Sequence, residues 1–155
     1  MGLDSLLTVK PIGRVIRGRA RGAEGDRWEE AESEIVIGAA WVDALDGLGE
    51  FSHLWVIWWL EAADDAPIPL RVHPQRRPDL PLVGLFATRS PRRPNPIAIT
   101  AVRLLAREGG RLRVRGLDAF EGSAVLDLKP YLSRGDQIAD SPYPEWLDRL
   151  WQESQ

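Results

Sequence analysis

The feature that most constrains the fold of this chain is a series of short strand-like segments with no regular helices between them. Strands at this spacing, without β–α alternation, are typical of barrels and sandwiches and not of doubly wound sheets. We therefore expect a mainly β protein, a compact antiparallel β-barrel with one or two short helices. The segments are rich in apolar and β-branched residues and cover 33–38, 52–60, 82–88, 97–108, 111–117 and 124–128.

The clearest local signal is a hairpin that joins the segments 97–108 and 111–117. Gly109 and Gly110 separate the two segments, and a glycine pair readily adopts the backbone angles of a tight turn. After the turn, apolar residues alternate with arginines. This alternation predicts a strand with one buried and one exposed face.

The segment 52–60 differs from the others because every residue from Leu54 to Leu60 is apolar. A strand without polar alternation is typical of a position that is buried on both faces. We also expect the tryptophans of the chain, several of which lie in this segment, to be chiefly core residues.

Two segments, 39–48 and 144–153, have apolar residues at helical spacing, and each predicts a short helix. The stretch 66–96 is rich in proline and predicts a long loop that the segment 82–88 interrupts. No G-x-G-x-x-G motif connects a strand to a helix, so we do not expect a Rossmann-type nucleotide site.

Length and composition fit one domain over 1–155 without a carboxyl-terminal extension. The absence of cysteine excludes disulfides, thiolate zinc sites and a cysteine nucleophile, and with only two histidines we expect no metal site. The amino terminus lacks a signal-peptide pattern, and the longest apolar run is too short to span a bilayer. We therefore expect a soluble, cytoplasmic protein with no membrane partner.

The net charge is −3, which by itself does not indicate a nucleic-acid binder. Most of the basic residues are arginines, and their distribution is more informative. Six arginines and a single acid, Asp79, lie between Arg71 and Arg93. The planar guanidinium matches phosphate and carboxylate groups and stacks on bases, which favours contact with RNA. The alternative is a solvated loop whose arginines pair with acids elsewhere in the chain.

The segment 84–100, GLFATRSPRRPNPIAIT, places a Thr-Arg-Ser motif and further arginines between two apolar stretches. Pro91, Pro94 and Pro96 stiffen this loop and lower the entropy that is lost when it becomes ordered. A stiff, arginine-rich loop is a suitable clamp for an anionic ligand.

This segment resembles the signature of the TrmO-like family of tRNA methyltransferases. Three further segments, 10–17, 50–60 and 117–132, resemble the family in the same order along the chain. The resemblance implies a closed β-barrel, S-adenosylmethionine as the cofactor, and a homodimer. It also implies that the substrate is tRNA and that the acceptor is the exocyclic nitrogen of threonylcarbamoyladenosine beside the anticodon.

Residue roles follow from the same resemblance. The implied cofactor contacts are Arg89, Ile99, Asp127, Leu128, Lys129 and Pro130. The residues expected to contact the anticodon loop are Arg71, Arg76, Arg77, Arg92, Arg93 and Asn95. Asp127 and Lys129 have an alternative interpretation, because two opposite charges two residues apart on a strand can form a structural ion pair.

The acceptor nitrogen is urea-like, so a base or a group that polarises the neighbouring oxygen would assist the reaction. Side chains of a suitable type are His53, Glu61, Asp118 and Tyr131, and the sequence does not choose among them. His53 precedes a buried strand and has an alternative interpretation as a hydrogen-bonded structural residue.

The chain departs from the family pattern at Glu61, at Ala98 and over 20–32, which leaves the RNA substrate open. Two alternatives to an RNA methyltransferase stay open as well. One is a barrel that binds S-adenosylmethionine or RNA without catalysis. The other is a methyltransferase for a small molecule or a protein.

Overall fold

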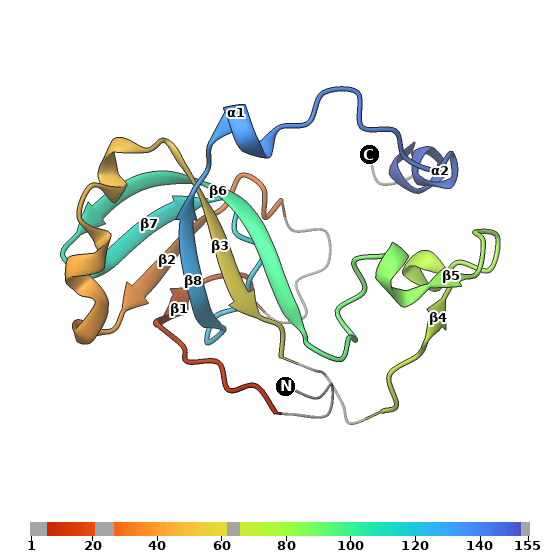
Figure 1. The fold of residues 1–155 in the computed structure, drawn as a ribbon, viewed down its shortest axis with the longest axis horizontal. Helices are drawn as coiled ribbons and strands as arrows, with labels where there is room; N and C mark the ends of the chain where they lie inside the picture. Colours follow the sequence, from red (N-terminus) through yellow and green to blue (C-terminus); the bar gives the residue numbers. More distant parts are fainter. Residues whose placement is uncertain (1–5, 21–26, 62–65, 153–155) are drawn as a thin grey trace. The chain divides into compact units, whose positions relative to one another are not determined.

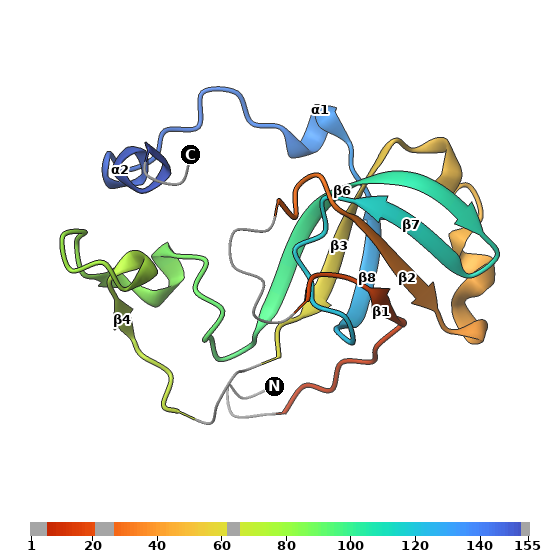
Figure 2. The same ribbon diagram turned by 180° about the vertical axis from the view of Figure 1, so that it is seen from behind.

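Six strands close into a ring in the order β1-β2-β7-β6-β3-β8, and every neighbouring pair is antiparallel (Figures 1 and 2). The computed structural model describes residues 6–20, 27–61 and 66–152. This closed ring confirms the expected antiparallel barrel. The bounds are β1 Gly13–Arg17, β2 Glu32–Ile37, β3 His53–Trp59, β6 Ile97–Glu108, β7 Arg111–Arg115 and β8 Ala124–Pro130.

The interior of the barrel is filled by alternate residues of each strand, because successive side chains of a strand point to opposite faces. On β7, Leu112 and Val114 are completely buried between exposed arginines, as the sequence predicts. The inward residues of the strands are Val15, Ile35, Ile37, Leu54, Val56, Trp58, Val102, Leu112, Val114 and Val125. These side chains make one continuous core.

The strand β3 buries only one of its faces. Leu54, Val56 and Trp58 lie in the core, whereas Trp55 and Ile57 are only half-buried on the outside. The expectation of a strand buried on both faces is therefore wrong. The apolar run hides the alternation, because the outer face of this strand is also apolar.

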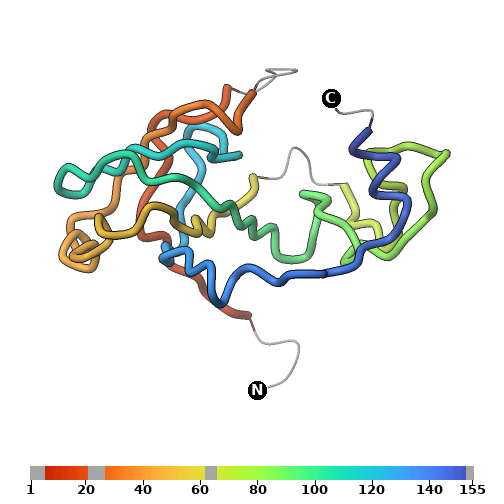
Figure 3. Tube along the Cα trace, turned by 90° about the horizontal axis from the view of Figure 1, so that it is seen from above, coloured from red at the N-terminus to blue at the C-terminus, as the bar shows by residue number. Residues whose placement is uncertain are grey.

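The hairpin between β6 and β7 is confirmed, and its trace can be followed in Figure 3. Gly109 has a φ of 56°, in the left-handed region that favours glycine. Gly110 is required by close packing, since a Cβ there would lie 2.9 Å from Cγ2 of Val42 and 3.1 Å from the Ile37 carbonyl oxygen.

The segment 39–48 forms 3-10 turns, so the expected helix is wrong in type and length. The turn η1 covers Ala39–Leu45, and η2 covers Leu48–Glu50. Gly47, at a φ of 80°, separates them, and η1 buries only Leu45. A single anchoring side chain does not stabilise a longer helix at this end of the barrel.

A second compact unit contains residues 66–96 and 132–152, and we describe it separately from the barrel. The C-terminal helix is confirmed, although it starts two residues later than the sequence predicts. The elements of this unit are β4 Arg71–Val72, η3 Pro74–Arg76, β5 Val83–Gly84, η4 Leu85–Ala87, α1 Ser133–Asp136 and α2 Trp146–Gln152.

The expected strand 82–88 is mostly wrong, because only Val83 and Gly84 pair, with β4. The chain then turns, since the Thr88 backbone N–H donates to the Leu85 carbonyl oxygen at 3.1 Å and the Thr88 hydroxyl donates to the same oxygen at 2.7 Å. Burial of Leu85 anchors this 3-10 turn.

The tryptophans are not chiefly core residues, contrary to the expectation. Of the seven, only Trp58 is buried, at 3% exposure, and its indole N–H donates to the Thr100 hydroxyl at 3.1 Å. Within the described ranges, no helix is long and apolar enough to cross a membrane.

Candidate functional site

The outer surface of β3 and of its two neighbours brings several of the predicted site residues together. Figure 1 shows β8, β3 and β6 side by side. We call this surface the β3 face. It consists of His53, Trp55, Ile57 and Trp59 on β3, Ile97, Ile99 and Ala101 on β6, and Asp127 and Lys129 on β8.

Two of the predicted cofactor residues flank the same residue of β3. Ile57 pairs with Ile99 on one side and with Asp127 on the other. Ile99 is 55% exposed. Sheet register therefore places an apolar surface beside a carboxylate, although these residues lie far apart in the sequence.

The Asp127 carboxylate already has two partners. It accepts a hydrogen bond from the backbone N–H of Leu128 at 2.9 Å and forms an ion pair with the Lys129 ammonium at 2.8 Å. Both side chains of the pair are about half exposed, so the pair is of the surface kind that is easily exchanged. The structural ion pair considered from the sequence is thus present, and it is open to a ligand.

The other two residues of the D-L-K-P segment are less accessible. The Leu128 side chain packs against the barrel core. Pro130 ends β8 opposite the buried Leu54. Their side chains help to fix the strand, while Asp127 and Lys129 face outward.

His53 and Tyr131, two of the four catalytic candidates, lie next to each other. The Tyr131 backbone N–H donates to the His53 carbonyl oxygen at 3.0 Å, and the two ring centroids are 6.4 Å apart. The Tyr131 ring also contacts Trp55, at 5.4 Å between centroids. His53 Nδ1 lies 2.9 Å from the Ser52 hydroxyl, which orients the imidazole.

The other two catalytic candidates have separate surroundings. Glu61 follows β3 at the end opposite to His53, and eight residues of strand-like chain span about 26 Å. The Asp118 carboxylate forms an ion pair with Arg19, whose guanidinium lies 5.6 Å from the ring of Phe120. The structure therefore brings together His53 and Tyr131 but not all four candidates.

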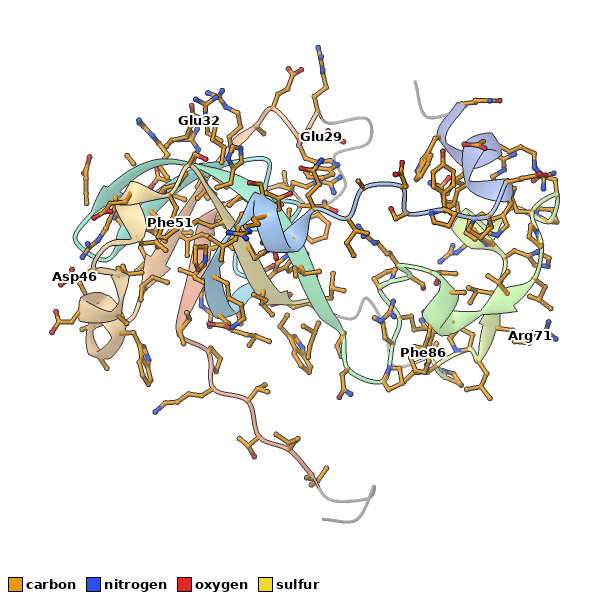
Figure 4. The ribbon with its side chains drawn as sticks, turned by 45° about the horizontal axis from the view of Figure 1, so that its top comes forward. Glu29, Glu32, Asp46, Phe51, Arg71 and Phe86 are labelled. Carbon is orange, nitrogen blue, oxygen red and sulfur yellow. The ribbon has the colours of Figure 1, made fainter. Side chains whose placement is uncertain are left out.

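The loop that carries Arg89 belongs to the second unit and is held together by Arg93. The Arg93 guanidinium donates to the carbonyl oxygens of Thr88 at 3.1 Å and Ser90 at 3.0 Å. It also lies 5.9 Å from the ring of Phe86, which is 78% exposed and is labelled in Figure 4. Arg93 therefore shapes the loop, and Arg89 is exposed beside it.

The arginines expected to contact RNA differ in their partners. Arg77 forms a two-point ion pair with Asp79, at 3.1 and 2.5 Å, and this hydrogen bonding lowers the pKa of the Asp79 carboxyl. Arg71, labelled in Figure 4, donates to the Leu82 carbonyl oxygen at 3.3 Å. Arg76 is exposed and has a φ of 60°, a backbone strain uncommon outside glycine.

Three further residues of this region can be placed. Asn95 is exposed and Arg92 is half-buried. His73 contacts the Leu80 carbonyl oxygen through Nδ1 at 2.7 Å, which makes it a structural residue of the η3 turn.

Comparison with known proteins gives the family of the chain. The profile of the family described as "tRNA-methyltransferase O N-terminal domain" matches residues 21–137, from before β2 to just after α1. The chain belongs to the TrmO family. A protein of Methanothermobacter thermautotrophicus named "Probable S-adenosyl-L-methionine-binding protein" is 41% identical over 138 residues, which cover 87% of this chain and 97% of that relative.

This TrmO-family chain matches two other proteins over a smaller share of their own length. The crystal structure of TrmO from Pseudomonas aeruginosa superposes with a TM-score of 0.67 at 30% identity, over 89% of this chain and 62% of that one. A mouse protein named tRNA (adenine(37)-N6)-methyltransferase is 39% identical over 93 residues, which cover 60% of this chain but 21% of that protein.

The TrmO-family barrel has surface hollows away from the β3 face. One, of about 380 Å³, lies beside Trp41 and the start of β1, and its lining contains none of the predicted site residues. Among the described residues, no group of histidines and acids could hold a metal ion. Residues 21–26, part of the segment 20–32 where the family pattern is lost, lie outside the described residues.

Sequence reasoning missed the outward residues of β3. Trp55, Ile57 and Trp59 were expected in the core, yet they form the centre of the β3 face. Their outward position could have been predicted, because successive residues of a strand point to opposite faces and these three share a face with the polar His53.

Proposed function

We propose that this TrmO-family chain binds S-adenosylmethionine over the β3 face and methylates a nitrogen of tRNA. The observation that supports it best is the register that puts Ile99 and Asp127 on either side of Ile57. On the same face, His53 and Tyr131 lie a few residues farther along β3 and β8. Residues suited to hold the cofactor and residues suited to accept a proton thus share one surface.

The residues of the β3 face fit the parts of S-adenosylmethionine. The apolar surface of Ile57 and Ile99 suits the adenine, and the Trp55 ring suits a cationic sulfonium. Asp127 can exchange its exposed Lys129 partner for the ammonium of the methionine part. Arg89, on the second unit, is exposed and carries a guanidinium of the kind that matches a carboxylate.

When bound, S-adenosylmethionine supplies an electrophilic methyl group. The chain itself provides orientation, exclusion of water and a proton acceptor. His53 is suited to accept the proton, because Ser52 orients its Nδ1 and no hydrogen bond to Nε2 occurs among the described residues. The Tyr131 ring lies beside the imidazole, with the two ring centroids 6.4 Å apart.

We propose as acceptor the exocyclic nitrogen of threonylcarbamoyladenosine beside the tRNA anticodon. The name of the matching family and that of the mouse relative support an adenine of tRNA as the substrate. The exposed Arg76 fits contact with RNA phosphates, and so does the arginine-rich composition of 71–93.

The test is incubation of the chain with labelled S-adenosylmethionine and total tRNA, followed by analysis of the labelled nucleoside.

Arg89→Ala should weaken cofactor binding, measured by calorimetry, by about 1.5–3 kcal/mol, the typical loss of a charged hydrogen bond. His53→Gln should leave cofactor binding nearly unchanged and lower the rate of methyl transfer about 100-fold, since only proton acceptance is lost.

A matched control is Arg27→Ala, because Arg27 is exposed and, among the described residues, pairs with Glu30 alone. Binding of the cofactor without label transfer to tRNA would favour a binding barrel without catalysis. Transfer of label to protein or to a small molecule, and not to tRNA, would contradict the proposed acceptor.

A further inference from the structure

A row of polar and aromatic side chains runs around the barrel from the edge of the β3 face. Each member lies opposite the next on a neighbouring strand, about 5 Å away. We call it the arginine row. Its members, in order, are Tyr131, His53, Arg103, Arg115 and Glu32, the last of which is labelled in Figure 4.

Arg103 lies at the middle of the row. Its side chain is exposed, and its guanidinium forms no hydrogen bond or ion pair, with a carboxylate or otherwise, within the part of the chain that the structure describes. Its cross-strand neighbours are His53 on one side and a second arginine, Arg115, on the other. A guanidinium in such surroundings keeps its charge and its donors for an external anion.

Two acids of the neighbouring strand β2 are each shared by two arginines. Glu32 is shared by Arg115 at 3.1 Å and Arg113 at 3.8 Å. Glu34 is likewise shared by Arg111 at 2.8 Å and Arg17 at 3.6 Å. Four arginines of this wall therefore share two carboxylates. The chain as a whole carries a net charge of −3, so the surplus of positive charge is local to this part of the surface.

The other end of the row is aromatic. The rings of Tyr131 and Trp55 lie 5.4 Å apart at an angle of 52°, and both side chains are half-buried. Bases stack on partly exposed aromatic rings, and phosphates bind exposed arginines. A ligand that matches this order of groups has planar rings joined to anions, which describes single-stranded nucleic acid better than an acidic peptide.

We propose that the arginine row is a phosphate-binding strip for single-stranded RNA. Arg103 holds a phosphate next to the acceptor nucleotide, and Tyr131 with Trp55 offers a stacking surface for a base. This inference rests on the proposed function, since it takes RNA as the substrate. It adds a contact surface on the barrel itself, distinct from the arginines of 71–93 on the second unit.

The test is the affinity of the full chain for fluorescently labelled tRNA, measured by anisotropy at several salt concentrations. Arg103→Gln should weaken binding about tenfold and reduce the salt slope by about one, because one phosphate contact is lost. Arg27→Gln removes the same charge from an exposed, ion-paired arginine outside the row and should change neither quantity appreciably. Both variants should bind S-adenosylmethionine as the parent does.

The outcomes separate this inference from the proposed function. Equal RNA binding by the Arg103 and Arg27 variants would overturn the strip and leave the methyltransferase proposal standing. An Arg103-dependent affinity without methyl transfer would support the strip and contradict the proposed reaction. Failure of the parent to bind tRNA would overturn both. Competition by polyglutamate as strong as that by RNA of equal charge would show a site for acidic peptides and overturn the strip.

Discussion

Individual arginines of this chain differ in what already holds them, and this difference determines which of them can bind an anion. Arg93 is committed to two carbonyl oxygens of its own loop, and Arg77 to the carboxylate of Asp79. Arg89 and Arg103 are exposed and have neither kind of partner among the described residues. Removing Arg77 or Arg93 should therefore affect local structure more than ligand affinity.

The pair of Arg77 and Asp79 gives a direct test of this distinction. The Arg77 side chain holds the pKa of the Asp79 carboxyl below its ordinary value of 3.8. Arg77→Gln should raise that pKa toward 3.8, measured by the carbon chemical shift of the carboxyl during an acid titration. Because the folded-state pKa is the lower one, any stability from the pair is present above pH 3.8 and is lost as the pH falls.

Arg71→Gln is a suitable control for the titration, since Arg71 donates to the Leu82 carbonyl oxygen and not to the Asp79 carboxylate. An unchanged Asp79 pKa in the Arg77 variant would show that the two side chains are not paired in solution.

At the scale of elements, β3 combines a core face and a ligand face in one apolar strand. Leu54 is completely buried, whereas Ile57, three residues later, lies on the opposite side and is half-buried. Both residues are aliphatic, so sequence composition alone does not distinguish their roles. Their pairing partners do, since Leu54 pairs with the buried Val102 and Ile57 with the exposed Ile99.

Replacing each of these residues with alanine should separate the two roles. Leu54→Ala should lower the free energy of unfolding by about 2–5 kcal/mol, because it leaves a cavity in the core. Ile57→Ala should cost clearly less stability and should weaken binding of S-adenosylmethionine. Urea denaturation and calorimetry measure the two effects. A stability loss for Ile57→Ala as large as that for Leu54→Ala would place Ile57 in the core.

The sequence predicts those elements whose local pattern agrees with their packing. The β6–β7 hairpin is an example, because Gly109 and Gly110 fit the turn and the alternation fits one-sided burial. The segments 39–48 and 82–88 were misjudged, since Gly47 and the Thr88 hydroxyl set their turns through local bonding that apolar spacing does not reveal.

The candidate site was predictable in parts only. Family resemblance marks Ile99 and Asp127, but their meeting at Ile57 depends on strand register, which no local pattern specifies. The same is true of Arg103, whose neighbours in the arginine row come from four other parts of the chain. Glu61 has a suitable side chain, and only the fold shows that it lies at the end of β3 opposite to His53.

At the scale of the whole molecule, large apolar side chains remain exposed on both units. Phe51, 37% exposed, on the barrel and Trp151, 49% exposed, on the second unit are examples. A symmetric dimer is the commonest way in which soluble proteins cover such surface. We therefore retain the expectation of a homodimer as a proposal.

Sedimentation equilibrium tests this proposal. The expected mass is twice the 17.4 kDa of one chain, and it should hold over a range of protein concentrations because apolar interfaces are stable. High salt should leave the mass unchanged, which serves as the control against association through surface charge. A mass of one chain at every concentration would contradict the dimer.

Closure of the barrel also sets the order in which the protein can fold. Gly13 of β1 pairs with Val125 of β8, more than a hundred residues farther along the chain. Pairings between such distant segments carry a large loop-closure entropy, so chains rich in them fold in milliseconds to seconds and not in microseconds. During synthesis, β1 leaves the ribosome without its second neighbour, and the seam stays open until β8 has been made. β8, which is translated after the other five strands, therefore closes the barrel and also contains Asp127. A chain that ends before β8 lacks both the closed fold and this part of the site.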